Sequence, residues 1–330
     1  MTFSVIIPVF NRPLEVRSLL ESLYLQTDRK FEVIIVEDGS WDTCENEVKA
    51  YRSKLDINYI YQENSGPGNT RNAGCRIALG DYFIFLDSDC VLPPHYMSIV
   101  KDRLSKHYTD AFGGPDEAMK DFTRLQRAIN YSMTSFFTTG GIRGSSEKLD
   151  KFHPRSFNMG YSREVFNHTE GFSSMRFGED IDMSIRIIQA GFTTRLVREA
   201  YVYHRRRTTL WGFFKQVYNS GIARIHLFKK HPHSLKAVHF APAVFTSGVL
   251  ILSMLSLLVS PYFLILLFLH ALIIFADATY RNKHPTIGLL SVGASYVQLL
   301  GYGIGFLHAF ILRMLLGKGE FSAFQRSFYK

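Results

Sequence analysis

Two aspartates, Asp87 and Asp89, directly follow the apolar run 82–86 and are separated by one serine. Side chains two residues apart point the same way along an extended backbone, so both carboxylates face one site. We expect this site at the end of a buried strand, where open α/β sheets bind their ligands. Paired carboxylates there suit a hard divalent cation, and the cation in turn suits a diphosphate. The alternative is a polar turn, because Asp and Ser favour turns in any protein.

A further acid, Asp38, follows the apolar stretch 31–36. An acid after the second strand of a nucleotide-binding fold typically contacts ribose hydroxyls or a base edge. The glycine-bearing loop 64–74 carries Arg71 and leads into a helix, which suits contact with phosphate or base but also describes an ordinary turn. The loop has neither a Gly-x-Gly-x-x-Gly pattern nor a Walker lysine, which disfavours a dinucleotide oxidoreductase and a P-loop kinase.

Two more acids, Glu179 and Asp180, precede the amphipathic stretch 181–188. Their structural interpretation is that acids in the first turn of a helix interact favourably with its dipole. Their functional interpretation is a general base at the mouth of a cleft. His204 stands next to three arginines at 205–207, and those arginines suit a leaving diphosphate.

The composition points to a membrane rather than to nucleic acid. The chain has 330 residues, 46% of them hydrophobic, and a formal net charge of +9. Between Arg195 and Lys236 the only acid is Glu199. A basic segment next to apolar segments favours a membrane-surface contact, with a solvated basic face as the alternative. The three cysteines have no metal-like spacing and fit a reducing compartment.

Up to about Val202, short apolar runs alternate with polar helical stretches. Strands are predicted at 4–7, 31–36, 57–61 and 82–86, and helices at 14–25, 43–54 and 70–79. This alternation predicts βαβ units around a largely parallel sheet. The continuous apolar character of the strands predicts that helices cover both faces of that sheet.

Two long stretches after this region, 237–276 and 285–312, contain no Asp, Glu, Lys or Arg. The first is long enough for two membrane spans of ~20 residues each, joined at Ser260-Pro261. The second has Gly301, Gly303 and Gly305 at its middle and predicts either one helix or a broken, re-entrant pair. We therefore expect two to four spans, of which an even number best satisfies the positive-inside rule. A buried soluble helical hairpin is the alternative.

The stretch 208–230 places apolar residues on one stripe at steps of three or four, namely Trp211, Phe214, Tyr218, Ile222, Ile225 and Phe228. Basic side chains nearby can reach lipid headgroups, so either an interfacial helix or a helix packed on the soluble domain is expected. The predicted domains are a catalytic domain 1–207, a basic amphipathic segment 208–236, a transmembrane region 237–316 and a basic tail 317–330.

Taken in order, these segments resemble the inverting family-2 glycosyltransferases, which have the GT-A nucleotide-diphosphosugar fold. The resemblance covers about residues 2–210 and rests on the segments 5–11, 36–40, 64–74, 87–89, 158–160 and 178–180 and on His204. It implies an α/β fold with a mixed, mostly parallel sheet and helices on both faces, followed by an α-helical membrane region. The family's usual Asp-Asp pair after the second strand is Glu37-Asp38 here, and the second acid, the usual base contact, is kept.

The resemblance implies a role for each motif. The nucleotide-binding residues would be Pro8, Phe10, Asn11, Asp38, Arg71 and Asp87. Asp89 would be the direct ligand of Mg²⁺ or Mn²⁺, with Asp87 and His204 near the metal. Asp180 would be the catalytic base, with Glu179 next to it. The segment Asn158-Met159-Gly160 would border the acceptor and the donor sugar.

These expectations describe a membrane-attached, metal-dependent glycosyltransferase. It would move a sugar from a nucleotide-diphosphate sugar, with a UDP-sugar favoured, to a hydroxyl of a lipid-linked or cell-surface glycan. Its partners would be this donor, this acceptor and membrane lipids, but no nucleic acid. We expect it to be multi-pass in the inner (cytoplasmic) membrane, with its catalytic domain in the cytoplasm. The alternatives are a polyprenyl-phosphate glycosyltransferase, whose acceptor needs no strong base, and a non-catalytic membrane scaffold that binds nucleotide sugar.

Overall fold

The computed structural model describes residues 1–119, 121–139 and 152–321. The chain divides into two compact units. Of the described residues, the first unit holds 1–119, 152–205 and Phe321, and the second holds 121–139 and 206–320. The stretch 121–139 therefore interrupts the first unit along the sequence and belongs to the second unit.

The first unit is built on a seven-stranded sheet in the order β3-β2-β1-β4-β8-β6-β9. Its parallel core is formed by β1 (Phe3–Val9), β2 (Phe31–Asp38), β3 (Ile57–Gln62) and β4 (Tyr82–Leu86). Beyond β4 come β8 (Asn158–Ser162), which is antiparallel, then β6 (Ala111–Gly113) and β9 (Thr194–Leu196). The mixed, mostly parallel sheet confirms the predicted α/β class.

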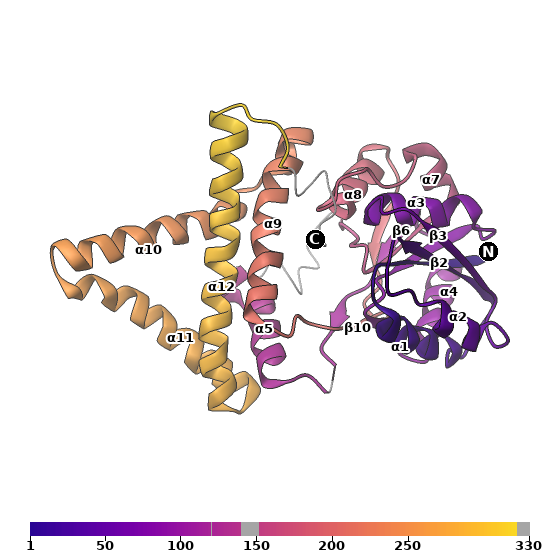
Figure 1. The fold of residues 1–330 in the computed structure, drawn as a ribbon, viewed down its shortest axis with the longest axis horizontal. Helices are drawn as coiled ribbons and strands as arrows, with labels where there is room; N and C mark the ends of the chain where they lie inside the picture. Colours follow the sequence, from indigo (N-terminus) through magenta and orange to yellow (C-terminus); the bar gives the residue numbers. More distant parts are fainter. Residues whose placement is uncertain (120, 140–151, 322–330) are drawn as a thin grey trace. The chain divides into compact units, whose positions relative to one another are not determined.

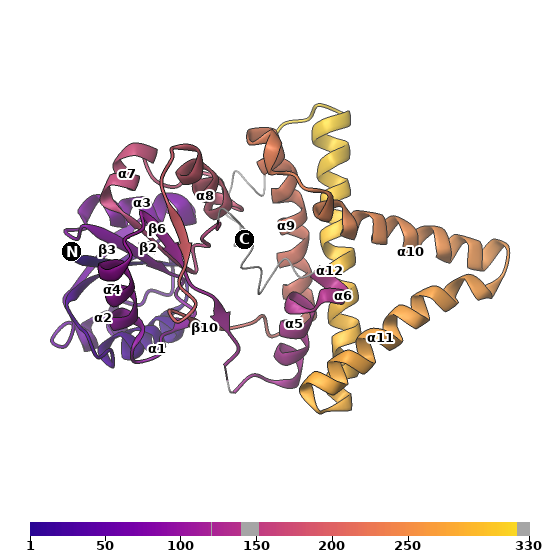
Figure 2. The same cartoon turned by 180° about the vertical axis from the view of Figure 1, so that it is seen from behind.

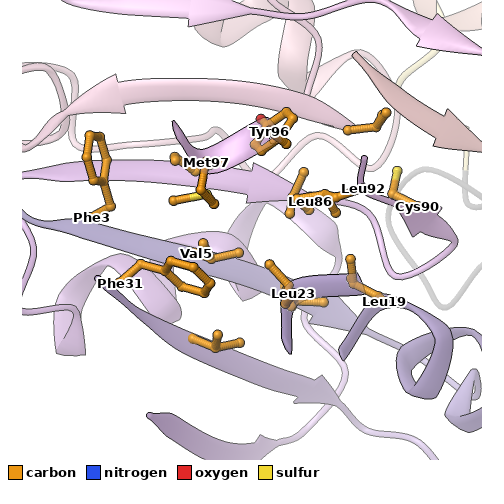
Figure 3. Close-up of a cluster of buried hydrophobic side chains, with 14 of the residues drawn as sticks. Phe3, Val5, Leu19, Leu23, Phe31, Leu86, Cys90, Leu92, Tyr96 and Met97 are labelled. Atoms are coloured by element: carbon orange, nitrogen blue, oxygen red, sulfur yellow. The ribbon is translucent and has the colours of Figure 1, made fainter. Parts of the chain in front are cut away.

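Helices cover both faces of this sheet because its strands are apolar on both sides. They are α1 (Pro13–Tyr24), α2 (Glu45–Tyr51), α3 (Pro67–Ile77), α4 (Tyr96–Lys106), α7 (Arg163–Thr169) and α8 (Glu179–Gln189). Val5 and Ile7 of β1 join one buried cluster, and Ile6 between them joins the other. Figure 3 shows the first cluster, in which Val5 packs with Leu19 and Leu23 of α1.

A second, three-stranded sheet adds residues from three distant segments to the first unit. It pairs β5 (Cys90–Val91) with β10 (Val202–His204), and β10 with β7 (Asp116–Glu117). The register sets His204 opposite Cys90, next to the acidic pair that follows β4. The sequence analysis did not predict this sheet, because strands of two or three residues have no periodicity to detect.

The second unit is helical (Figure 2). It comprises α5 (Arg124–Thr134), α6 (Phe136–Thr139), α9 (Leu210–Lys230), α10 (Ala241–Leu258), α11 (Ile265–Asn282) and α12 (Pro285–Phe310), with a π-helical turn at Ile311–Leu315 and single 3₁₀ turns at Pro232–Ser234, Ala237–Phe240 and Pro261–Leu264. Three segments are long and apolar enough to cross a membrane: Ala237–Leu258, Pro261–Asn282 and Pro285–Leu315. The helices α5 and α6 fall within the range predicted for the catalytic domain, yet α5 packs against α9 and α12.

The helix α12 is continuous across Gly301, Gly303 and Gly305, so the re-entrant alternative does not match the structure. These glycines allow neighbouring helices to approach closely. A Cβ atom on Gly305 would stand 2.1 Å from the carbonyl oxygen of Tyr218 in α9, and one on Gly303 would stand 2.4 Å from the carbonyl oxygen of Pro242. Figure 1 shows α9 and α12 side by side, and α10 and α11 diverging from α12 toward a shared tip. The buried face of α9 therefore packs within its own unit.

The substitution Gly305→Ala tests this close packing. The new methyl group would collide with backbone of α9, so we expect a loss of about 1–3 kcal/mol in stability, as for other overpacked sites. The measurement is the thermal unfolding of the full-length protein in detergent. Gly293→Ala is the matched control, because a Cβ there meets nothing within 4 Å. Equal unfolding temperatures for the two variants would contradict the packing.

Candidate active site

Asp38, the last residue of β2, holds the loop in front of α3. Its carboxylate accepts hydrogen bonds from the backbone N–H groups of Ser65 (2.8 Å) and Gly66 (3.0 Å). The side-chain amides of Gln62 (3.0 Å) and Asn64 (3.1 Å) also donate to it. Asp38 is only 5% exposed, so a nucleobase would share this carboxylate with the loop. Its nucleotide-binding role stays a prediction.

The end of β1 carries the other predicted base contacts. Pro8 lies in the strand, and Phe10 and Asn11 follow it. Asn11 adopts a φ of 53°, donates its backbone N–H to Ser40 Oγ (2.8 Å) and accepts from the backbone N–H of Trp41 (3.0 Å). The Trp41 ring is exposed and packs edge-to-face on Phe10, with 5.4 Å between the ring centroids. This aromatic pair at the sheet edge offers a surface on which a base could stack.

Arg71 of α3 joins two acids that are far apart in the sequence. Its Nη1 donates to Glu179 Oε1 (2.9 Å), and its Nη2 donates to Asp87 Oδ1 (2.8 Å). The guanidinium is buried and lies 5.4 Å from the centroid of the Phe172 ring. A buried charge is tolerated when it is paired in this way. Arg71 therefore connects the acidic strand end of β4 to the start of α8.

Asp180 is paired with an arginine that the sequence analysis did not identify. Arg155 Nε donates to Asp180 Oδ2 (2.6 Å), and the backbone N–H of Ile181 donates to Oδ1 (2.8 Å). Burial acts to raise the pKa of Asp180, but the charge and hydrogen bond of Arg155 bring the pKa below its ordinary value. The carboxylate is consequently ionised at neutral pH and able to accept a proton.

The pKa of Glu179 is shifted in the opposite direction to that of Asp180. Burial, followed by the negative charge of Asp180, raises the pKa of Glu179 to about 7, while Arg71 acts against this rise. Two arginines, Arg71 and Arg155, face three acids: Asp87, Glu179 and Asp180. One carboxyl group of the three is thus left without a cation of its own.

Asp89 contacts two basic side chains from other segments. Arg12 donates to its Oδ2, and His204 Nε2 lies 3.0 Å from its Oδ1. Asp116 of β7 lies on the other side of the imidazole, with its Oδ2 3.9 Å from His204 Nδ1. Burial acts to raise the pKa of Asp89, but His204 and Arg12 hold the pKa well below its usual range.

These residues fit a hard divalent cation. One ligand atom each from Asp89, Cys90 and His204 lies within 4.8 Å of the others. The Cys90 thiol donates to the carbonyl oxygen of Phe157 (3.4 Å), and burial raises its pKa, so it is unsuited to binding a hard ion. Carboxylate and imidazole ligands suit Mn²⁺, and Asp87 in the same loop can add another oxygen. The metal-binding role of Asp87, Asp89 and His204 stays a prediction.

The segment Asn158-Met159-Gly160, predicted to border the acceptor and the donor sugar, lies at the start of β8. All three residues are buried in β8. Asn158 accepts a hydrogen bond from the Tyr96 hydroxyl (2.6 Å) and donates to the carbonyl oxygen of Ala200 (2.8 Å). The side chain of Asn158 thus joins β8 to neighbouring elements. The place of the segment beside the acceptor and the donor sugar stays a prediction.

Four further residues of the site were not predicted: Arg12, Trp41, Asp116 and Arg155. Arg12 directly follows the first motif, and Arg155 lies three residues before Asn158, so their positions near motifs were the available signal. Asp116 had no sequence signal, because the three-stranded sheet brings it to His204.

The sequence model of the family described as "Glycosyl transferase family 2" matches residues 4–169. An uncharacterized glycosyltransferase of Rickettsia felis is 41% identical over 86 residues, which are 26% of this chain and 14% of that protein. The poly(ribitol-phosphate) beta-N-acetylglucosaminyltransferase TarS of Staphylococcus aureus is 33% identical over 114 residues, which are 33% of this chain and 20% of that protein. The matches thus span a fifth or less of these relatives' own length.

Solved structures share the fold. Mannosyltransferase PcManGT from Pyrobaculum calidifontis, solved with GDP-Man and Mn²⁺, has a TM-score of 0.65 at 16% identity, over 92% of this chain and 86% of that chain. Residues 1–349 of S. aureus TarS, in complex with UDP, have a TM-score of 0.50 at 18% identity, over 96% of this chain and 92% of that chain. These neighbours and the sheet order confirm the predicted GT-A-type fold.

The substitution Glu179→Gln tests the raised pKa of Glu179. The folded-state pKa of about 7 lies above the ordinary value of 4.5, so the folded protein keeps a proton that the unfolded chain releases between these pH values. The resulting stabilisation is complete below the ordinary pKa and is lost as the pH rises through the folded-state pKa, by up to about 1.4 kcal/mol per pH unit. We expect the free energy of unfolding of the wild type, relative to Glu179→Gln, to fall as the pH rises to about 7 and then to level off.

Denaturant unfolding curves at several pH values measure this difference. Glu164→Gln, a change at an exposed acid in the first turn of α7, is the control and should show no such pH dependence. A difference between wild type and Glu179→Gln that stays constant with pH would contradict the raised pKa.

Proposed function

The chain belongs to glycosyl transferase family 2, and we propose that it moves a sugar from a nucleotide-diphosphate sugar, with a UDP-sugar favoured, to a hydroxyl of a lipid-linked or cell-surface glycan. The observation that carries this proposal is the bridge from Asp87 through Arg71 to Glu179, with Asp180 next along α8. It brings a candidate base into the same network as the acidic pair at the end of β4. Residues separated by most of the first unit's sequence thus form one reaction site.

The choice of donor is supported by the structural neighbours. TarS has been solved with UDP and with UDP-GlcNAc, and it is also related to this chain in sequence. PcManGT has been solved with GDP-Man, so the fold itself accepts more than one nucleotide. We favour UDP because the sequence relationship adds to the likeness in fold.

The reaction is a single displacement at the anomeric carbon. Asp180 takes the proton of the acceptor hydroxyl while the hydroxyl oxygen bonds to the anomeric carbon from the face opposite the nucleotide. The bond from that carbon to the diphosphate oxygen breaks, and its electron pair leaves with the nucleotide. The configuration is inverted and no enzyme nucleophile is needed, unlike in retaining hydrolases, which form a covalent intermediate. Arg155 orients Asp180 and keeps it ionised.

The proposed reaction also uses a divalent cation. Asp89 and His204, with Asp87 nearby, would hold Mg²⁺ or Mn²⁺, which when bound offsets the charge on the departing diphosphate. Arg12 contacts Asp89 and is positioned to contribute positive charge at the same place. Support comes from the ligand types in the site and from the Mn²⁺ in the PcManGT structure.

The three apolar segments associate the protein with a membrane. We assign a multi-pass location in the inner (cytoplasmic) membrane, with the catalytic domain in the cytoplasm. The basic residues before Lys236, together with Arg281 and Lys283 between α11 and α12, support this orientation through the positive-inside rule. An acceptor located at the bilayer fits this arrangement. TarS, as its name states, acts on poly(ribitol-phosphate), so a related enzyme uses a polymeric acceptor.

Asp180→Asn tests the base. We expect donor binding to persist and the transfer rate to fall by about 10²–10⁴-fold, the usual contribution of a general base. The measurement is nucleotide release with acceptor, beside donor binding by calorimetry. Asp182→Asn is the matched control, because Asp182 lies in the same first turn of α8 and pairs with Arg186. Transfer that survives Asp180→Asn would favour a phosphate acceptor, which needs no strong base.

Removal of the divalent cation tests the metal assignment. EDTA should abolish nucleotide release, and added Mn²⁺ or Mg²⁺ should restore it. Asp89→Asn should weaken Mn²⁺ binding by at least about tenfold in titrations followed by electron paramagnetic resonance. Asp102→Asn, a change on the exposed face of α4, should leave Mn²⁺ binding unchanged. Unchanged turnover in EDTA would refute the metal assignment.

A further inference from the structure

We propose that α10 and α11 cross the bilayer as a hairpin, whereas α12 lies along the lipid surface on the side from which the hairpin enters. By length and composition alone, all three segments qualify as membrane spans. The packing within the second unit separates them. The inference goes beyond the proposed reaction, because it concerns where the lipid surface meets the second unit and holds for any activity of the first unit.

Opposite sides of α12 pack against different helices. A Cβ atom on Gly305 would stand 2.1 Å from the carbonyl oxygen of Tyr218, so this glycine faces α9. Gly303, two residues away, faces the carbonyl oxygen of Pro242 in α10. Residues two apart on an α-helix point in nearly opposite directions, because each residue turns the helix by about 100°. The helix α12 therefore lies between α9 and the hairpin.

The hairpin leads away from α12 rather than along it. Figures 1 and 2 show α10 and α11 running from α12 to a shared tip, at a steep angle to α12 and on the side away from α9. A hairpin that crosses the bilayer in this direction requires α12 to lie close to the plane of the membrane. Conversely, if α12 crossed the bilayer, both helices of the hairpin would lie along that plane.

The exposure of the three segments favours the first arrangement. Only 11% of the apolar stretch of α10, and 11% of that of α11, is buried inside the protein, against 44% for α12. The sequence 237–276 has no Asp, Glu, Lys or Arg. A helix that is apolar all round and not covered by protein requires lipid around it. Each hairpin segment has 22 residues, a length of ~33 Å, which is enough for a hydrocarbon core of about 30 Å.

Neighbouring helices explain why α12 is apolar without crossing the bilayer. Its first half packs against α5, whose Ile129 and Met133 join Ile287 and Ala294 in one buried cluster. Its second half packs against α9, and the hairpin meets it on the side opposite to α9. A helix that is covered by neighbours is buried as in the core of a soluble protein, so its composition alone does not make it a span.

The charges of α9 oppose a spanning position for α12. The two helices run side by side, since the side chain of Val217 faces Gly301 and His226 contacts Arg313 (3.2 Å). The helix α9 carries four lysines and arginines, namely Lys215, Arg224, Lys229 and Lys230. If α12 crossed the bilayer, α9 would enter the hydrocarbon beside it. Charged side chains are strongly disfavoured there, so the pair α9 and α12 belongs at the surface.

Two crossings also place every basic segment on one side of the membrane. The residues before Lys236 lead into the hairpin, Arg281 and Lys283 follow it, and Arg313 and Lys318 come at and after the end of α12. With α12 on the surface, all of them share one side. With three crossings, Lys318 would lie on the opposite side from Lys283. The positive-inside rule favours two crossings.

The exposed face of α9 fits the headgroup region of a lipid surface. Trp211 is exposed, and Lys215 Nζ lies 5.4 Å from the centroid of its ring. Tryptophan together with basic side chains is typical of the boundary between lipid and water. The sequence has no acid between Glu199 and Asp277, so α9 has a positive charge that complements anionic lipid headgroups.

Cysteine labelling in sealed membrane vesicles tests the number of crossings. The three native cysteines are buried, so the wild type gives the background reaction with a membrane-impermeant maleimide. We expect Lys283→Cys, before α12, and Lys318→Cys, after it, to react from the same side of the vesicle. Ser260→Cys, between the two hairpin helices, should react from the other side only. Reaction of Lys283→Cys and Lys318→Cys from opposite sides would overturn the proposal, because α12 would then cross the bilayer.

Spin labels measure the depth of α12 directly. Leu289, Ile304 and Ile311 are exposed along the helix, and a single cysteine at each carries a nitroxide in lipid vesicles. Its depth follows from relaxation by oxygen and by a water-soluble nickel chelate, measured by electron paramagnetic resonance. We expect equal depths on α12. On α10, the matched control, a label at Leu250 should lie deeper than one at Val244. A difference of ~10 Å between Ile304 and Ile311, the rise of seven residues, would overturn the proposal.

Discussion

The buried guanidinium of Arg71 is the interaction on which the site depends. It lies on α3, yet its two partners come from the end of β4 and the start of α8. Without it, Asp87 and Glu179 would face each other and Asp180 with little compensating charge, and like charges in a buried place repel strongly. The fold brings the end of β4 close to the start of α8. Arg71 allows the acid that follows β4 to stay there together with the acids of α8.

The charge balance of the site favours a metal-bound diphosphate over a free one. The acids Asp87, Asp89, Glu179 and Asp180 are set against Arg12, Arg71, Arg155 and His204. A diphosphate alone would add negative charge beside carboxylates that already share their cations. A diphosphate that arrives with a divalent cation adds little net charge, so it can enter without upsetting these pairs. In the proposed reaction, the acidic pair after β4 would therefore act through a divalent cation.

Much of the first unit follows from the sequence, because β1, β2 and β4 are largely apolar runs and acids stand at the end of β2 and directly after β4. Periodicity located β1 to β4, and the motif order located Asp38, Asp87, Asp89 and Asp180. The partners of these acids could not be located in this way. Arg155 reaches Asp180 from another part of the chain, and Asp116 reaches His204 through short strands without periodicity. The contacts of Asn158 could not be predicted either, since a polar residue in a motif can equally be a buried amide that bonds to backbone.

The structure of the helical unit could also be predicted only in part from the sequence, for a different reason. The hydrophobic spans were predictable in length, but a helix that is apolar all round gives no indication of which face meets its neighbours. The small residues carry that information. Gly221 and Gly305 set α9 against α12, and Gly303 sets α10 against α12. A Cβ atom on Gly248 of α10 would meet nothing within 4 Å. A glycine that is not needed for close helix contact leaves space, and Gly248 lines a groove between α10 and α12. Glycines in these helices therefore have two distinct uses, and the packing around each one decides which.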